Sequence, residues 1–210
     1  MAINYSKGSP MFYRPETGHG LPHNPFSALI APRPIGWIST RCAQGDNLAP
    51  YSFFNAVAHV PPQVMFASTS TKPDRAGTKD SVAQVIESGH FCVNIATGDL
   101  RDQVNASSAT LPAHESEFRA AGIEAAECET IDCPRVAGAA AALECRMTQV
   151  LPLAGAANFV VFGVVTGIHI RDDCILDGRF DPGPAGGWIS RLGYKDYATI
   201  TELFQMERPE

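Results

Sequence analysis

Two apolar runs joined by a polar turn, PRPIGWIST at residues 32–40 and NLAPYSFFN at residues 47–55, decide the fold of this chain. Prolines hold the first run extended, and Gly45 and Asp46 are typical of a turn, so the stretch predicts a strand, a turn and a returning segment. Hydroxyl and amide side chains stand beside aromatic ones in both runs, which suits a flat ligand with polar edges. A β-hairpin that gives half of its side chains to a core fits the same pattern, and the sequence leaves both interpretations open.

The composition excludes several classes of partner. The chain has 210 residues, enough for one domain with a sizeable core, and its formal net charge is −6. This charge gives no reason to expect nucleic acid or an anionic membrane as a partner. No apolar run approaches the ~18 residues of a membrane helix, and residues 1–25 lack the apolar core of a secretion signal. We therefore expect a soluble, cytoplasmic protein.

The cysteines do not form a metal-binding pattern. There are six, none in a Cys-x-x-Cys motif, and we expect reduced thiols rather than disulfides. Cys128 and Cys133 are close in sequence, but no second ligand pair of metal spacing follows them. The sequence therefore predicts no metal site.

The chain divides into an arm at residues 1–24, a domain at residues 25–185 and a tail at residues 186–210. The arm is rich in Gly, Pro and His, and we expect it to be ordered only where it lies on the barrel or on another subunit. The tail, with its glycines and aromatic residues, would pack on the barrel or on a partner subunit.

The apolar runs predict a mainly β protein with helical insertions. Further strands are expected at residues 64–68, 91–95, 140–153 and 158–170, and helical pieces at 100–105 and 115–121. Gly163 inside the last strand suggests a bulge or a close backbone approach. Strict βαβ alternation is absent and no Gly-x-Gly-x-x-Gly follows a strand, which disfavours a Rossmann fold. We predict an antiparallel barrel with helical excursions.

A short helix is predicted after residue 80, with Val82, Val85 and Ile86 on one face, Gly89 at its end and Thr78 or Asp80 as its cap. Its N-terminus would offer N–H groups and a partial positive charge, to which Arg75 and Lys79 add two full charges. This outlines an anion site suited to phosphate. An ordinary capped helix with solvated charges fits the same residues equally well.

Several ordered motifs resemble the flavin reductase-like proteins of the FMN-binding split-barrel superfamily. They are residues 32–35 with Ser39 and Thr40, residues 47–55, the prolines at 61 and 62, residues 79–81 and 91–94, and the run into His169 and Ile170. The match covers roughly residues 26–181. The ending at residues 190–194 resembles that of one subgroup.

This resemblance implies a split β-barrel of the antiparallel Greek-key type, a homodimer, and FMN rather than FAD near the subunit interface. The motifs carry over cofactor contacts in three groups. These would be Trp37, Ile38, Ser39 and Thr40 along the isoalloxazine and ribityl chain; Ser52, Phe53, Phe54 and Asn55 at the ribityl and phosphate region; and Arg75, Lys79, Asp80 and Ser81 around the phosphate.

The resemblance also implies hydride transfer from NAD(P)H to the flavin, with no obligatory acid or base from the protein. One departure bears on that step. Many reductases of this superfamily carry Gly-Asp-His five residues before a strand glycine, and here Ala156, Ala157 and Asn158 stand in its place. Asn158 can hydrogen-bond but cannot carry a positive charge, which weakens the case for direct NAD(P)H oxidation. His169 is a candidate substitute, although a structural role fits it equally.

Four functions remain open at this stage, and one of them is a split-barrel domain that binds no flavin; the other three are oxidoreductive. The first is an NAD(P)H-dependent flavin reductase, which would pass reduced flavin to an oxygenase or electrons to another acceptor. The second is a flavoredoxin-like FMN electron carrier reduced by a protein partner, which Asn158 favours slightly. The third is an FMN-dependent reductase of a small organic substrate or a ferric chelate. Arg191 and Tyr194 would either cover the pocket or pack on the barrel.

Overall fold

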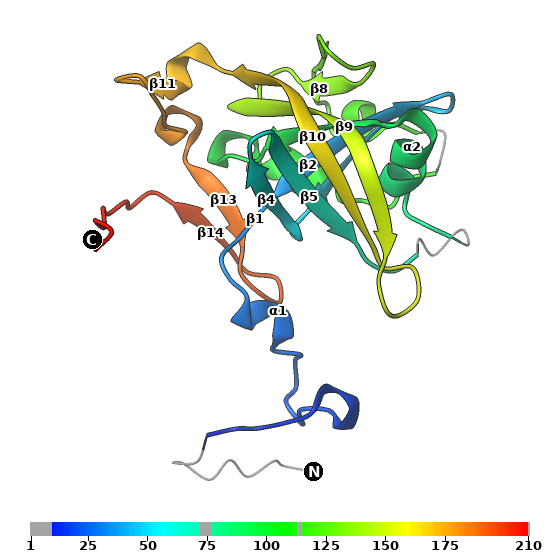
Figure 1. Ribbon diagram of the computed structural model, residues 1–210, viewed down its shortest axis with the longest axis vertical. Helices are drawn as coiled ribbons and strands as arrows, with labels where there is room; N and C mark the ends of the chain where they lie inside the picture. Colours follow the sequence, from blue (N-terminus) through cyan, green and yellow to red (C-terminus); the bar gives the residue numbers. More distant parts are fainter. Residues whose placement is uncertain (1–9, 72–76, 113–114, 210) are drawn as a thin grey trace.

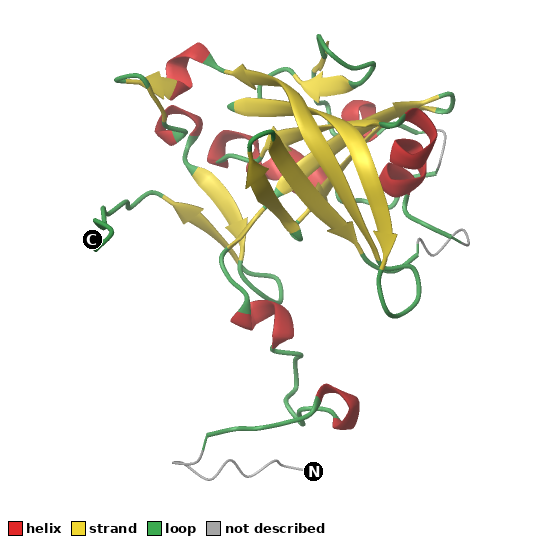
Figure 2. Cartoon of the chain, viewed as in Figure 1, coloured by secondary structure: helices red, strands yellow, loops and turns green. Residues whose placement is uncertain are grey.

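Seven antiparallel strands form the main sheet of the protein (Figures 1 and 2). The structure is a computed structural model that describes residues 10–71, 77–112 and 115–209. The strands do not lie in chain order, as connections of the Greek-key type require. Across the sheet they are β3 (Gly45–Tyr51), β2 (Gly36–Cys42), β6 (His90–Ile95), β9 (Ala141–Pro152), β10 (Phe159–Ile170), β5 (Pro62–Ser68) and β4 (Phe54–His59).

The longest helix, α2 (Asp80–Ser88), packs against the inner core of this sheet. This inner core is an apolar cluster that includes Val82 and Val85 of the helix. From the sheet it includes Ile38, Phe66 and Phe91. Gly89 ends the helix in the left-handed conformation, and its N–H donates to the Val85 carbonyl at 2.8 Å, as the sequence predicts.

The predicted cap of α2 is wrong. Lys79, rather than Thr78 or Asp80, occupies the N-cap position and makes no side-chain capping bond there. Asp80 is the first helical residue, where its charge favours the helix dipole.

Strand β2 is buried on both faces. Ile38 belongs to the inner core, whereas Trp37 belongs to a second cluster with Leu48, Val104 and Phe118 on the opposite face. Alternate residues of a strand point to opposite faces, so a sheet covered on both sides buries consecutive side chains. This explains why residues 35–40 are all buried without alternation.

The returning segment expected at residues 49–55 is two strands. β3 ends at Tyr51 and β4 begins at Phe54, where the chain leaves β2 to pair with β5. The Phe53 carbonyl accepts a bond from the Ala67 amide at 2.7 Å, which fixes this corner.

Strands β9 and β10 form the long hairpin expected from the sequence. Their register shifts between Phe162 and Gly163, which confirms the predicted irregularity. A Cβ atom at Gly163 would lie 2.6 Å from the Phe91 ring, so only glycine fits this close approach.

None of the described helices combines the length and the apolar character needed to cross a bilayer. Smaller elements surround the main sheet. A three-stranded sheet contains β1 (Arg33–Pro34), β13 (Trp188–Arg191) and β14 (Tyr197–Ile200). Two ribbons contain β7 (Ala125–Glu127) with β8 (Pro134–Val136), and β11 (Ile175–Leu176) with β12 (Arg179–Phe180). The helices are α1 (Phe26–Leu29), α3 (Arg101–Ala106), α4 (Glu117–Ala120), η1 (Pro15–Thr17), η2 (Gly98–Leu100), η3 (Asp172–Cys174) and η4 (Gly183–Ala185).

An early and a late segment of the chain pair beside the barrel. Arg33 pairs with Arg191 and Pro34 with Ser190, so the late strand β13 extends a sheet begun by β1. Residues 10–24 leave the barrel beyond α1, as Figure 1 shows. The ring of His23 still lies 5.6 Å from that of Tyr194.

Candidate functional site

Two adjoining cavities form a continuous cleft beside β3. The first, of about 360 Å³, is lined by Lys79 and is called here the Lys79 cavity. The second, of about 430 Å³, is lined by Arg33 and is called the Arg33 cavity. Pro50 and Ser108 line both, so they mark the point at which the two cavities join.

Hydroxyl groups dominate the wall of the Lys79 cavity. Residues 79–81, at the start of α2, form one side of it. The hydroxyl-bearing residues are Tyr51, Ser70, Thr71, Ser81, Ser107, Ser108 and Thr110. Such a wall can hydrogen-bond a polyol chain at many points.

A chain of buried polar groups supports this wall from below. The Asn47 amide donates to Ser81 Oγ at 2.9 Å and to Thr40 Oγ1 at 3.3 Å. Thr40 Oγ1 in turn donates to Gln84 at 2.7 Å. Burial raises the pKa of Tyr51 to about 12, against hydrogen bonds with Ser81 and Ser68, so its hydroxyl stays protonated at neutral pH.

The charges in the Lys79 cavity are mixed. Lys79 stands with Asp80 and Glu117 among the lining residues. Glu117 is buried, and its carboxylate accepts a bond from the Leu48 amide at 3.1 Å. Because carboxylates oppose a bound anion, the helix terminus and Lys79 must provide the attraction at this end.

The Arg33 cavity is assembled from three distant parts of the chain. Arg33 comes from β1, Ser52 and Phe53 from the corner after β3, and Arg191 and Tyr197 from the late sheet. The Arg33 guanidinium donates to the carbonyls of Ser27 and Ile30, and its carbon lies 5.7 Å from the Phe53 ring centroid.

Two arginines meet in this cavity, and its lining, as far as the chain is described, contains no Asp or Glu. Arg33 is 8% exposed, and its Nε is buried without a hydrogen-bond partner among the described residues. Desolvation, followed by the charge of Arg191, lowers the pKa of Arg33. Like charges held together in a net acidic protein provide a site for an anionic or electron-rich group.

The late segment reaches the cavity through a close contact at Gly193. A Cβ atom at this position would lie 2.4 Å from the Ala28 Cβ and 2.7 Å from the Ala28 Cα. Arg191 donates to the Tyr194 carbonyl at 2.5 Å and lies over the Tyr197 ring at 4.4 Å. These contacts fix the second guanidinium beside the cavity.

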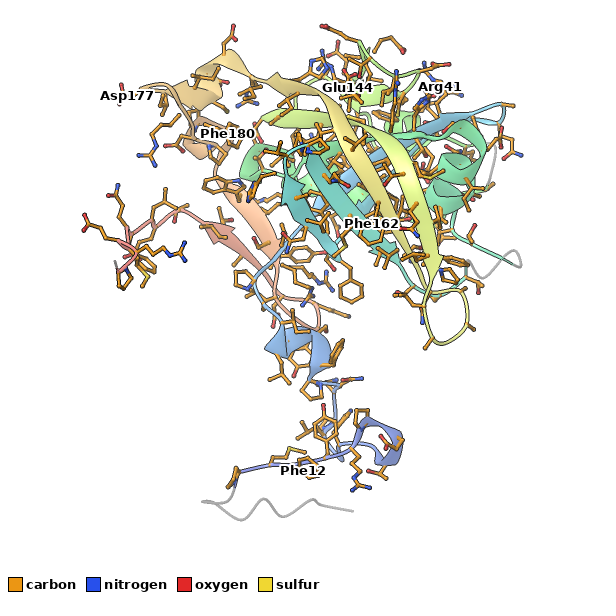
Figure 3. All side chains as sticks on the ribbon, in the orientation of Figure 1. Phe12, Arg41, Glu144, Phe162, Asp177 and Phe180 are labelled. Atoms are coloured by element: carbon orange, nitrogen blue, oxygen red, sulfur yellow. The ribbon has the colours of Figure 1, made fainter. Side chains whose placement is uncertain are left out.

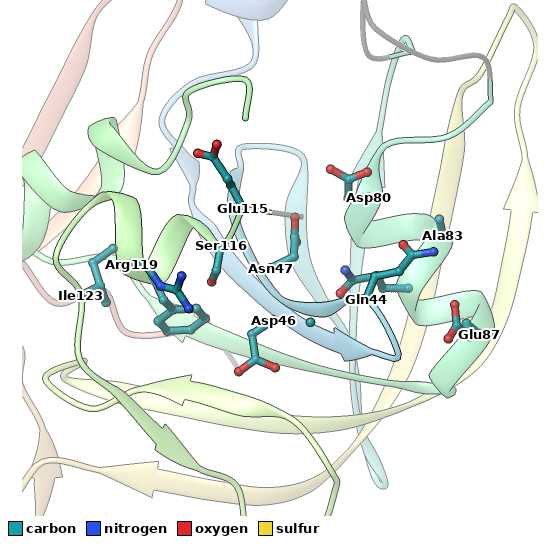
Figure 4. Close-up of a pocket in the computed structure, with 13 residues that line it drawn as sticks. Gln44, Asp46, Asn47, Asp80, Ala83, Glu87, Glu115, Ser116, Arg119 and Ile123 are labelled. Carbon is teal, nitrogen blue, oxygen red and sulfur yellow. The ribbon is translucent and has the colours of Figure 1, made fainter. Parts of the chain in front are cut away.

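A larger pocket of about 540 Å³ lies next to the cleft (Figure 4). The tip of the β2–β3 hairpin, α2 and the segment before α4 enclose it, and Asp46, Asp80, Glu87 and Glu115 outnumber its single Arg119. Its size does not make it the better phosphate site, because four carboxylates would repel an anion.

Four predicted cofactor contacts lie beneath the cleft rather than in it. Trp37, Ile38, Ser39 and Thr40 are each 0% exposed. The Trp37 indole donates to Ser107 Oγ at 2.9 Å, and Ser39 Oγ donates to the Pro134 carbonyl at 2.6 Å. These side chains are buried because both faces of β2 are covered. Their contact with a cofactor stays a prediction.

The other predicted contacts divide between the cleft and the surface. Lys79, Asp80 and Ser81 line the Lys79 cavity, and Ser52 and Phe53 line the Arg33 cavity. Phe54 instead packs over Gly36, and Asn55 is exposed and accepts a bond from the Ala56 amide. Arg75 lies outside the described residues.

Neither catalytic candidate lines the cleft. Asn158 donates to the Ala154 carbonyl at 2.8 Å within the β9–β10 loop. His169 is hydrogen-bonded to the buried carboxylate of Glu144. β10 carries His169 to Glu144 rather than to the cleft, and a role of His169 near the cofactor stays a prediction. No group of three or more His, Cys, Asp or Glu side chains suited to a metal ion occurs among the described residues.

Sequence reasoning missed several residues of the cleft. Arg33 enters the sequence-based prediction only as part of the motif at residues 32–35, and no pattern in the sequence points to Tyr197. The hydroxyl-rich runs at residues 68–71 and 107–110 were a usable signal, because several hydroxyl groups close together can hydrogen-bond a polyol chain.

The comparisons with known proteins agree with this fold. The family model described as "Flavin reductase like domain" matches residues 29–182, and the chain belongs to that family. The crystal structure of nitrilotriacetate monooxygenase component B from Bacillus cereus is similar, with a TM-score of 0.81 and 28% identity, covering 98% of this chain and 100% of that one.

Two further solved structures are similar. The 2-nitrobenzoate 2-nitroreductase of Pseudomonas fluorescens has a TM-score of 0.75 and 25% identity, covering 88% of each chain. A protein with a split barrel domain from Shewanella frigidimarina has a TM-score of 0.76 and 20% identity, covering 88% of this chain and 90% of that one. The fold is thus a split β-barrel of the flavin reductase-like type.

Proposed function

We propose that the cleft binds FMN and that the protein is an oxidoreductase using this flavin with NAD(P)H as electron donor. One observation carries the proposal: two joined cavities of different chemistry. The Arg33 cavity offers Phe53, Tyr194 and Tyr197 to a flat ring, and the Lys79 cavity offers hydroxyls and a helix terminus to a polyol and a phosphate. A flavin mononucleotide has these parts in this order.

The residues fit the cofactor. The two cavities, of about 360 and 430 Å³, lie within the usual range of ligand pockets, roughly 300–1,000 Å³. The buried Arg33 Nε lacks a partner among the described residues and would find one in a ring oxygen or nitrogen. Lys79 would hold the phosphate.

The bound flavin would supply the hydride-accepting chemistry, while the protein binds and orients it. Arg33, held by the Ser27 and Ile30 carbonyls, would present its charge without reorganising. Pro50 and Phe53 would place apolar surface against the ring. No acid or base from the chain is required. A homodimer with the cofactor near its interface completes the proposal.

The test is a titration of the purified protein with FMN and with riboflavin, followed by anaerobic addition of NADH and then NADPH. We expect FMN to bind more tightly, and its absorption near ~450 nm, a general flavin property, to bleach with one nucleotide. A bound but unbleached flavin would favour the electron carrier reduced by a protein partner. A protein that binds neither flavin would overturn the proposal.

One observation favours a second function, the reduction of a small organic anion or a ferric chelate. Arg33 and Arg191 share a cavity without a carboxylate among its described lining residues, and the similar Pseudomonas protein is named a 2-nitrobenzoate reductase. A substrate carboxylate would bind between the guanidiniums. The test compares 2-nitrobenzoate with neutral nitrobenzene as acceptors. Arg191→Gln should lower the rate of 2-nitrobenzoate reduction by about tenfold and leave the rate with nitrobenzene unchanged. Lys195→Gln is the control and should alter neither rate.

A further inference from the structure

Three cysteines form a sulfur cluster on the far side of β2 from the inner core. Cys92 on β6 and Cys133 before β8 are fully buried, and Cys128 after β7 is half-buried. Cys128 packs against the buried cluster that contains both Cys92 and Cys133. These three sulfurs have no part in the cleft.

The hairpin that carries two of these cysteines is held firmly on the barrel. Glu144, labelled in Figure 3, accepts bonds from the amides of Glu129 and Thr130 at 2.8 and 2.6 Å. Arg41, also labelled, bonds Glu127 and Asp132 at 2.7 and 2.9 Å. The sulfurs therefore stay together because both sides of the turn are fixed.

The backbone places Cys128 and Cys133 at facing positions. Glu127 pairs with Pro134, and the next pair along the two strands is Cys128 with Cys133. The Cys128 amide donates to the Cys133 carbonyl at 3.1 Å. Facing residues of antiparallel strands have Cα atoms about 4.5–5.5 Å apart, within the range that a disulfide spans.

The surroundings favour the thiolate form of Cys128. The neighbouring side chains of Cys133 and Cys92, and more weakly His169, lower its pKa, whereas burial and Glu144 oppose the shift. The same contacts raise the pKa of Cys92 and of Cys133. One partly exposed thiolate beside protonated thiols is the arrangement of an oxidisable cysteine and its resolving partner.

We propose that Cys128 is a peroxide-sensitive thiol that forms a reversible disulfide with Cys133. The Cys128 thiolate attacks hydrogen peroxide, the O–O bond breaks, and a sulfenic acid forms as hydroxide leaves and takes up a proton. Cys133 then loses its proton, attacks the Cys128 sulfur, and breaks the S–O bond as water leaves. Two thiols lose two electrons, and one peroxide becomes two waters. This inference is independent of flavin binding.

The experiment treats the reduced, full-length protein with hydrogen peroxide at neutral pH, blocks the remaining thiols after denaturation, and maps them by tryptic mass spectrometry. Cys128 and Cys133 share the tryptic peptide of residues 120–135, whereas Cys92 lies in that of residues 80–101. We expect both cysteines of the peptide of residues 120–135 to escape the blocking reagent. The mass of this peptide should be two hydrogens lower than that of its reduced, unblocked form, and dithiothreitol should reverse the change. Cys42, half-buried without a thiol neighbour in the described structure, is the internal control and should stay blocked.

Two variants sharpen the result. Cys133→Ser should stop at a sulfenic acid on Cys128 that dimedone traps, and Cys128→Ser should slow peroxide consumption at least tenfold. The peptide mapping is done on the unaltered chain, so that test does not depend on whether either variant folds. A cross-link to the 80–101 peptide, or oxidation of Cys42 as fast as Cys128, would overturn the proposal.

Discussion

The side-chain amide of Asn47 donates to the hydroxyl of Ser81 at 2.9 Å, which joins β3 to the first turn of α2. The same amide bonds Thr40, so one buried residue joins β2, β3 and the start of α2 beneath the Lys79 cavity. The cleft therefore depends on a polar group that its ligand does not need to touch.

Replacing this residue tests that dependence. Asn47→Ala should lower the free energy of unfolding by about 1–3 kcal/mol, because the buried Ser81 and Thr40 hydroxyls lose a partner. Urea unfolding monitored by circular dichroism gives the value. The matched control is Asn55→Ala, an exposed residue on β4, for which we expect a change within about 0.5 kcal/mol. Equal losses in both variants would contradict the prediction.

Lys79 should distinguish FMN from riboflavin. Lys79→Met removes a positive charge at the proposed phosphate position, and a charge-assisted bond is worth about 1.5–3 kcal/mol, or roughly 10- to 150-fold in affinity. FMN binding, followed by fluorescence quenching, should weaken by that factor while riboflavin binding is unchanged. Lys195→Met, in the exposed loop before β14, should alter neither. If Lys79→Met weakened the binding of FMN and of riboflavin equally, Lys79 would not be the residue that holds the phosphate.

Glu144 should make stability depend on pH. Burial opposes its ionisation, but bonds from Thr130, the Glu129 amide and His169 outweigh burial and lower its pKa to about 2. A depressed carboxyl pKa contributes stability above the ordinary value of 4.5, and that stability is lost as the pH falls toward 2.

The magnitude follows from this shift. Between pH 6 and pH 2, Glu144 should account for up to about 3 kcal/mol of lost stability. Glu144→Gln should be less stable than the parent at pH 6 and lose less on acidification, as measured by denaturant unfolding at each pH. Parallel pH curves for the two proteins would refute the assignment.

The close packing of Gly193 against Ala28 should hold the Arg191 guanidinium in place beside the Arg33 cavity. Gly193→Ala places a Cβ atom against Ala28, and such overpacking costs typically about 1–3 kcal/mol. The late segment should become easier to cleave by trypsin after Arg191, as limited proteolysis would show. Gly138→Ala, where an added Cβ meets nothing within 4 Å, is the control. Identical cleavage rates would show that the contact is dispensable.

The strands could be predicted because β-branched residues and turn residues mark them locally, as in β10 with its bulge at Gly163. The anion end of the cleft was also predictable, because Lys79 and the start of α2 are neighbours in sequence. The burial of Trp37 was not, since it depends on Val104 and Phe118 covering the outer face of β2. The Arg33 cavity was not predictable either, because β1 has two residues and no periodicity that would reveal its pairing with β13.

The pairing of β1 with β13 also sets an order of events during synthesis. Arg33 leaves the ribosome early, whereas Arg191 and Tyr197 emerge more than 150 residues later, as the positions 33 and 191 require. A nascent chain can close the β2–β3 hairpin and begin its core, but it cannot assemble the Arg33 cavity. Ligand capture at that cavity must therefore wait until β14 has emerged, because the complete cleft does not exist before then.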